Sequence, residues 1–234
     1  MPNKLLFQNV QTEKLSRKIS RQLLQSIVDG HYQPGSLLPS ERDLATAFGV
    51  SRVVVREGLN SLISKGILSV RQGRGTTVNP MNEWNAIDPE VFMLLYGDQA
   101  FDSLIQLRRI LEPELAFLAA QNITDEELEE LQAFSDLPDT DTSEEHVERD
   151  TAFHLIIARA THNPVLLIVL SSVSEMLRES RRRTFAVPNE LYKARDWHHV
   201  IYHAIASRDP ATARQAMLTH LEQVSTALHK YHDG

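Results

Sequence analysis

Apolar residues recur with a helical period along most of this chain. Near its start, Leu15, Ile19, Leu23 and Ile27 occupy every fourth position, a spacing typical of an amphipathic helix that buries one face. After residue 89 the helical period returns and continues nearly to the end. It predicts helices over 90–96, 101–121, 125–135, 143–161, 164–183, 189–207 and 210–232. The chain beyond residue 89 is therefore predicted to be an all-α bundle.

Two short helices separated by a tight turn are predicted ahead of that bundle. Ser40 is suited to cap the first helix, and Asp43 stands three residues later to complete a capping box. Gly49 stands where a left-handed residue would end that helix, and Ser51 can cap the next helix almost at once. This is the spacing of a helix-turn-helix motif.

The second of these helices has two distinct faces. Val55, Leu59 and Leu62 recur at helical spacing and are predicted to face the core. Arg52 and Arg56 lie on another line, from which guanidinium groups can reach guanine edges or phosphates in a major groove. The alternative is a solvated charged face, which is the usual meaning of two arginines on a helix. The capped helix and the tight turn before them favour DNA.

The helical pattern gives way to strand-like residues after Gly66. Residues 67–70 and 76–78 flank a Gln-Gly-Arg-Gly sequence at 72–75, which predicts a β-hairpin with a basic, glycine-rich tip. Such a wing can lie against phosphate or enter a minor groove. An ordinary hairpin turn is the alternative, but the helix pair beside it favours a winged helix-turn-helix.

Charge divides the chain at about residue 80. Of 234 residues, 24 are Lys or Arg and 31 are Asp or Glu, so the net charge is −7. Residues 1–80 carry 11 basic and 5 acidic side chains, or +6, whereas the remainder carries 13 and 26, or −13. A basic module joined to an acidic domain is the asymmetry expected of a DNA-binding protein with a separate second domain.

Composition limits the class of protein further. Hydrophobic residues make up 42% of the chain and charged residues 24%, as in a soluble globular protein. There is no cysteine, which excludes a disulfide framework and a thiolate metal site. The chain has neither an apolar run of about 18 residues nor the apolar core of a signal peptide, so we expect no membrane span and a cytoplasmic location.

Four side chains in the predicted bundle form a candidate metal site. Asp150 and His154 lie one helical turn apart and share a face. His198 and His220 are in register with the apolar residues of their own helices, so both are predicted to point inward. One carboxylate and three imidazoles suit Zn²⁺ first, with Ni²⁺ or Mn²⁺ as alternatives. A lone inward histidine is more often a core residue with one hydrogen bond, and that alternative stays open.

The first part of the chain resembles the winged helix-turn-helix of the GntR family of bacterial transcription regulators. The likeness covers about residues 10–79. It rests on Leu-Pro-Ser-Glu-Arg-x-Leu-Ala at 38–45, Ser-Arg-x-x-Val-Arg-Glu at 51–57 and Gly-x-Gly-Thr at 73–76. The resemblance implies a set of DNA-contacting residues, with the last two in the minor groove: Arg42, Ser51, Arg52, Arg56, Gln72 and Gly73. Two residues depart from the family pattern. Val54 stands where Pro or Thr is usual, and Gly58 replaces an Ala.

Residues from about 95 to 230 resemble the FadR C-terminal (FCD) domain, the all-helical effector domain of one GntR subfamily. The likeness rests on Arg-Arg-Ile-Leu-Glu at 108–112, Ala-Ala at 119–120, Asp-x-x-x-His at 150–154 and His-Leu at 220–221, with a further histidine at 198. Metal-binding members use an Asp and three His that match Asp150, His154, His198 and His220. The resemblance implies an ion with positions open to a carboxylate effector, whose oxygens Arg108 can meet. A pair between Arg108 and Glu112 is an equal alternative.

These patterns predict a winged domain over 1–79, a linker over 80–92 and a metal- and effector-binding domain over 93–234. Linker residues 82–88 resemble those of regulators of sugar-acid catabolism, such as regulators that respond to galactonate. We expect a homodimeric repressor of a catabolic operon, which binds a palindromic double-stranded operator and senses a small organic or sugar acid through its metal. Two alternatives stay open, a metal-dependent hydrolytic enzyme and a direct sensor of the metal.

Overall fold

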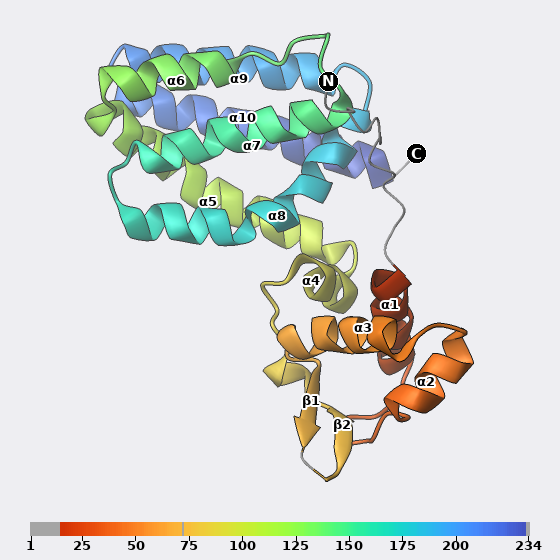
Figure 1. The fold of residues 1–234 in the computed structure, drawn as a ribbon. Coiled ribbons are helices and arrows are strands. Elements are labelled where there is room, and N and C mark those ends of the chain that lie inside the picture. The colour runs from red at the N-terminus through yellow and green to blue at the C-terminus, as the bar shows by residue number, and fades with distance from the viewer. Residues whose placement is uncertain (1–14, 72, 233–234) are drawn as a thin grey trace, which may run out of the picture. The chain divides into compact units, whose positions relative to one another are not determined.

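The computed structural model describes residues 15–71 and 73–232 and divides the chain into two compact units (Figure 1). Met1–Val91 form the winged unit and Phe92–Gly234 form the helical unit. The predicted fold class, mainly α with a small two-stranded wing and an all-helical second domain, is confirmed. Among the residues that the structure describes, no helix is both long enough and apolar enough to cross a membrane.

In its described part, the winged unit combines helices with one antiparallel hairpin. Its elements are α1 (Leu15–Val28), α2 (Glu41–Phe48), α3 (Arg52–Ser64), β1 (Leu68–Arg71), β2 (Gly75–Val78) and a 3₁₀ turn over Met81–Glu83. The two strands pair with Leu68 opposite Val78 and Arg71 opposite Gly75. The first of these pairs is buried and the second is exposed, so the hairpin is anchored at its base and its tip projects into solvent.

Capping residues fix the ends of α2 and α3. Ser40 Oγ accepts a hydrogen bond from the Asp43 amide at 3.2 Å, and Gly49 ends α2 with a φ of 66°. Ser51 Oγ accepts a hydrogen bond from the Val54 amide at 3.4 Å and so begins α3. These are the caps that the sequence predicts, and they set the tight turn of the helix-turn-helix.

Close packing of α1 on α3 explains the glycine that departs from the family pattern. A Cβ at Gly58 would lie 2.9 Å from Ser16 O and 3.1 Å from Ile19 Cγ2. Glycine costs about 1 kcal/mol in helix propensity relative to alanine, but alanine would force the helices apart. Ile19 and Leu23 are buried as predicted, whereas Leu15 is 56% exposed, so its predicted place on the buried face is wrong.

The segment after β2 folds back on the end of α3. Asn79 Nδ2 donates a hydrogen bond to Gly66 O at 2.8 Å, and the Asn85 amide donates to Lys65 O at 2.8 Å. Trp84 is buried, and its Nε1 donates to Asn79 O at 3.0 Å. Residues 79–85 are therefore packed on the winged unit rather than extended away from α3.

The helical unit consists of seven helices within the described residues. They are α4 (Pro89–Tyr96, which begins in the winged unit), α5 (Gln99–Asn122), α6 (Asp125–Ser135), α7 (Ser143–Arg159), α8 (Pro164–Ala186), α9 (Glu190–Ala206) and α10 (Pro210–His232). The most extensive contact between any two of them is that of α5 with α10. A core of buried residues lies among these helices, including Leu115, Phe153, Ile157, Ile201 and Met217. α7, α9 and α10 therefore each contribute apolar side chains to one core.

Gly66→Ala should destabilise the winged unit. Gly66 has a φ of +72°, and a Cβ there would lie 2.5 Å from Glu83 O. Left-handed strain and a clash with backbone together predict a loss of about 2–4 kcal/mol. Calorimetry should show a lower melting temperature for the winged unit alone. Gly35→Ala is the matched control, because Gly35 has a φ of +84° but nothing within 4 Å of the added Cβ. Equal losses in the two variants would refute the close approach.

Candidate functional site

Three helices of the helical unit bring one carboxylate and three imidazoles together. α7 carries Asp150 and His154 one turn apart, α9 supplies His198 and α10 supplies His220. All four residues are buried, and each offers one ligand atom within 4.8 Å of the other three. The four residues that the sequence singles out as metal ligands thus meet in one place.

Ring packing rather than hydrogen bonding holds His198 and His220 in the cluster. His198 stacks on Phe153 with ring centroids 4.1 Å apart, and His154 stacks on His220 at 5.4 Å. Both ring nitrogens of His198 and of His220 are buried without a hydrogen-bond partner. His198 Nε2 lies 3.3 Å from Asp150 Oδ1, but without hydrogen-bonding geometry. Leaving a buried polar atom unpaired costs about 1–3 kcal/mol, and a divalent ion is the natural partner of such lone pairs. The donor set therefore fits a metal better than it fits core histidines.

Two buried arginines lie against the cluster. Arg108, on α5, donates from Nε to Glu112 Oε1 at 2.6 Å, and its Nη2 lies 3.1 Å from His154 Nε2. Arg181, on α8, donates from Nε to Asp150 Oδ2, and its Nη1 is buried without a hydrogen-bond partner. Arg108 therefore fits both of its interpretations, the pair with Glu112 and a position beside the candidate metal site.

The sequence patterns do not single out Arg181, although it contacts Asp150 in the cluster. It belongs to a run of three arginines, of which Arg182 is 43% exposed, and such runs usually form a solvated face. A signal is nevertheless present, because Arg181 continues the helical spacing of the buried residues Ser174 and Leu177. Helical period alone would have placed it inward.

The buried carboxylates remain ionised because each has a guanidinium partner. Burial alone would raise the pKa of Asp150, but Arg181 and the nearby imidazoles hold this pKa well below its usual value. Burial likewise acts to raise the pKa of Glu112, and Arg108 together with His154 outweighs burial and lowers it. Two buried negative charges are thus offset by two buried positive charges.

Burial favours the neutral form of two imidazoles of the cluster. Burial lowers the pKa of His154, and it lowers the pKa of His220 well below the usual value with help from His198. Ionised carboxylate and neutral imidazole are the protonation states that metal ligation requires. His199 is half-buried and His203 is exposed, both on another face of α9, and neither takes part in the cluster.

The winged unit carries the candidate DNA-contacting arginines on an exposed face. Arg56 donates two hydrogen bonds to Glu41, from Nε to Oε1 at 2.9 Å and from Nη2 to Oε2 at 2.7 Å. Arg52 Nη2 lies 3.4 Å from the same Oε2, while the Arg42 side chain is 82% exposed. Glu41, on α2, thus holds two guanidinium groups of α3 in defined directions.

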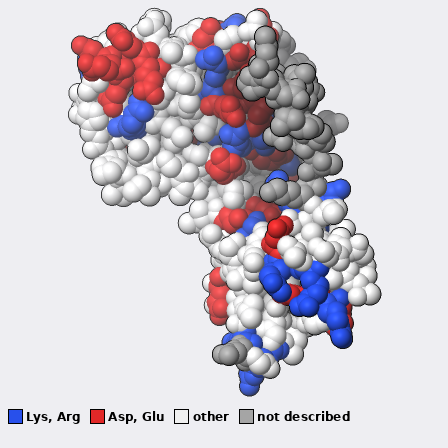
Figure 2. All heavy atoms as spheres, viewed as in Figure 1, with Lys and Arg blue, Asp and Glu red and all other residues white. Residues whose placement is uncertain are grey.

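The other candidate DNA contacts lie at the start of α3 and at the hairpin tip. Ser51 is exposed and caps α3, and Gly73 has a φ of +76° with open space around it. Gln72 lies outside the described residues. Figure 2 shows Lys and Arg gathered on the winged unit and much of the acidic surface on the helical unit, in agreement with the charge division of the sequence.

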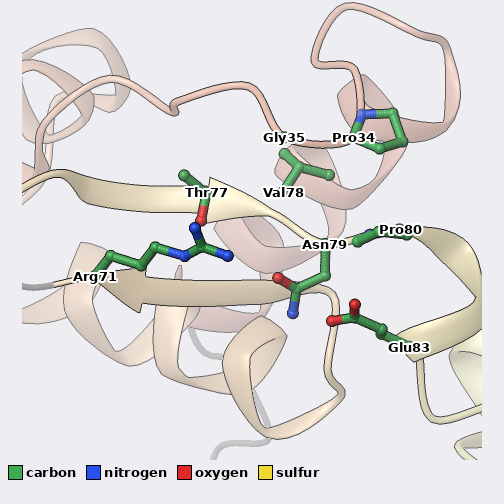
Figure 3. Close-up of a pocket in the computed structure, with 8 residues that line it drawn as sticks. All are labelled: Pro34, Gly35, Arg71, Thr77, Val78, Asn79, Pro80 and Glu83. Atoms are coloured by element: carbon green, nitrogen blue, oxygen red, sulfur yellow. The ribbon is translucent and has the colours of Figure 1, made fainter.

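A pocket of about 300 Å³ lies beside the wing, within the winged unit (Figure 3). It is lined by Pro34, Gly35, Arg71, Thr77, Val78, Asn79, Pro80 and Glu83. Figure 3 shows the Arg71 side chain extended beside Thr77, with Glu83 near Asn79. Arg71 is exposed, so the wing presents a cation that can meet a phosphate.

Comparison with known proteins gives a match for each unit. Residues 15–78 match the model described as bacterial regulatory proteins, gntR family, and residues 103–223 match the FCD domain. The HTH-type transcriptional regulator LutR of Bacillus subtilis is 34% identical, over 88% of this chain and 97% of its own. The galactonate operon transcriptional repressor of Escherichia coli is 30% identical, over 82% of this chain and 87% of its own. Among solved structures, Streptococcus agalactiae GntR superposes with a TM-score of 0.50 at 26% identity, over 90% of this chain and 99% of that one.

Glu112→Ala should destabilise the helical unit strongly. The substitution leaves Arg108 buried without its carboxylate, and breaking a buried pair in this way costs about 3–5 kcal/mol. Glu114→Ala, two residues along the same helix, removes a pair with Arg214 in which both side chains are about half exposed. That control should lose about 1 kcal/mol or less. Urea unfolding of both variants gives the comparison, and similar losses would rule out a special role for the buried pair.

Proposed function

This chain belongs to the gntR family of bacterial regulatory proteins and carries an FCD domain, and on that premise we propose that it is a homodimeric repressor of a catabolic operon. The family consists of DNA-binding transcription regulators, which sets aside the alternative of a hydrolytic enzyme. The proposed signal is a small organic or sugar acid that binds at a divalent ion in the helical unit. The burial of four metal-ligand side chains around unpaired imidazole nitrogens carries this proposal.

DNA recognition is assigned to α3 and the wing. The start of α3 would enter the major groove, where Arg52 and Arg56 can reach base edges, with Ser51 and Arg42 beside them on phosphate. Gly73 at the hairpin tip would enter the minor groove, and the family resemblance implies the same role for Gln72. The ion pair with Glu41 supports this assignment, because it keeps both α3 guanidinium groups extended on the exposed face.

A palindromic operator follows from a two-fold symmetric dimer. In such a dimer the same surface of each protomer reads an identical half-site, so the spacing of the two α3 helices fixes the spacing of the half-sites. An effector can then act by changing the relative placement of the two α3 helices. It must bind the two arrangements of the dimer with different affinity, because equal affinity would shift nothing.

The ion is assigned to Asp150, His154, His198 and His220. Zn²⁺ is favoured by the three imidazoles and the absence of thiolates, with Ni²⁺ or Mn²⁺ next. A bound divalent ion would supply positive charge and open coordination positions. The chain itself supplies the ionised carboxylate of Asp150 and the neutral imidazoles of His154 and His220, and its apolar core excludes water from around them.

Charge balance favours an anionic effector. The charges of Asp150 and Glu112 are offset by Arg181 and Arg108, so the charge of a bound ion would remain available to a ligand. Arg108, beside His154, is the residue proposed to meet the carboxylate oxygens of that ligand. A relative named as a galactonate operon repressor is consistent with a hydroxy acid as the effector class.

Arg56→Ala should weaken operator binding by roughly 10- to 100-fold, and Arg52→Ala should do the same, if these side chains read bases. Binding to unrelated DNA should fall much less, because its affinity comes from phosphate contacts. Fluorescence anisotropy with operator and scrambled duplexes at one salt concentration measures both. Arg159→Ala, in the helical unit, is the control and should bind as the wild type does. Unchanged operator affinity in both α3 variants would remove α3 from the interface.

His198→Ala should lose both the metal and the response to acid while it keeps operator binding, because the DNA contacts belong to the winged unit. His199→Ala is one residue along, at a half-buried position outside the cluster, and should keep all three properties. Elemental analysis after purification without chelators gives the metal content, and operator release by galactonate gives the response. Equal metal loss in the two variants would refute the assigned ligands. Operator release by the metal alone would favour the direct metal sensor.

A further inference from the structure

The two oxygens of the Asp150 carboxylate have different surroundings. Oδ2 accepts a hydrogen bond from Arg181 Nε. Oδ1 lies on the side of His198, whose Nε2 is 3.3 Å away. His154 Nε2 is 3.8 Å from Oδ2. An ion held by the three imidazoles would therefore meet the Asp150 carboxylate with its Oδ2 already bound to Arg181.

Arg181 is poorly explained as a purely structural side chain. It is 3% exposed and comes from α8, which contributes none of the four ligand residues. Burial of a guanidinium is expensive, and a stabilising buried pair needs its remaining donors satisfied. Arg181 Nη1 is buried without a hydrogen-bond partner, so the pair with Asp150 leaves one buried donor of this guanidinium unused.

The number of oxygens that Asp150 can offer determines how many positions an ion keeps open. Three imidazoles and one carboxylate oxygen would occupy four positions, so an ion with six positions, such as Mn²⁺, would retain two for a ligand. If both carboxylate oxygens bound the ion, one position would remain. A ligand that chelates through a carboxylate oxygen and a neighbouring hydroxyl needs two adjacent positions, whereas a simple carboxylate needs only one.

We propose that Arg181 is a specificity-determining residue, which restricts Asp150 to one ligand oxygen and thereby selects 2-hydroxy acids over simple carboxylic acids. The inference rests on the proposed metal site and names the class of effector that the site accepts. Arg181 acts through Asp150, and its positive charge offsets the Asp150 carboxylate, so the charge of the ion remains available to attract an anion.

The test compares glycolate with acetate, which differ only in the 2-hydroxyl group. Calorimetric titration of Mn²⁺-loaded full-length protein gives both dissociation constants, and the wild type should prefer glycolate. In Arg181→Met this preference should fall about tenfold at full metal content. Loss of a residue that orients a metal ligand typically costs 10- to 100-fold in metal affinity or activity. Arg181→Lys should restore part of it. Arg182→Met, at the next residue and half exposed, should behave as the wild type does. An unchanged preference in metal-loaded Arg181→Met overturns the proposal.

A second measurement on the wild type does not depend on how the variants fold. Glycolate labelled with ¹⁷O at the hydroxyl should broaden the electron paramagnetic resonance lines of bound Mn²⁺, as should glycolate labelled at the carboxylate. Broadening from the carboxylate label alone overturns chelation and the role of Arg181 with it. Failure of the wild type to hold Zn²⁺, Ni²⁺ or Mn²⁺ overturns the metal site itself. Chelation without operator release would count only against the regulatory proposal and would leave the role of Arg181 standing.

Discussion

The interior of the helical unit is governed by the burial of charged and polar side chains among apolar helices. Asp150, Glu112, Arg108 and Arg181 are all at most 3% exposed, and each charge has an opposite charge in contact. Removal of charges from water is costly, and only close pairs with satisfied hydrogen bonds recover that cost. The pairs account for the four charges, but they leave the imidazole nitrogens of His198 and His220 without partners. The proposed divalent ion would take one nitrogen from each of these imidazoles.

The winged unit is subject to a different constraint, because its charged side chains must stay on the surface and point in defined directions. Glu41 is on α2 and its partners Arg52 and Arg56 are on α3, so the tight turn between the helices determines whether these groups meet. That turn depends on the left-handed Gly49 that ends α2 and on the cap at Ser51 that begins α3. A pattern of local hydrogen bonds therefore controls the direction of the guanidinium groups that we propose read DNA.

Much of this structure is predictable from the sequence because it is encoded locally. Helix period, capping residues and hairpin signals depend on neighbours a few positions apart, and the fold class and caps follow from them. The inward positions of His198 and His220 also follow from helical spacing. The contact between Arg181 and Asp150 does not, because it joins residues 31 positions apart on different helices. The need for glycine at residue 58 likewise depends on the approach of α1, and the exposure of Leu15 shows that helical period alone does not fix the first turn.

The central claim is that the buried cluster holds a divalent ion at which a hydroxy acid binds. X-ray absorption spectroscopy of the purified protein at the edge of the bound metal tests it most directly, with and without galactonate. The account predicts scattering from three imidazoles and from oxygen ligands, with the oxygen shell changed by the acid and the imidazole shell retained. An absent metal, a shell without imidazole, or a spectrum that galactonate leaves unaltered would contradict the account.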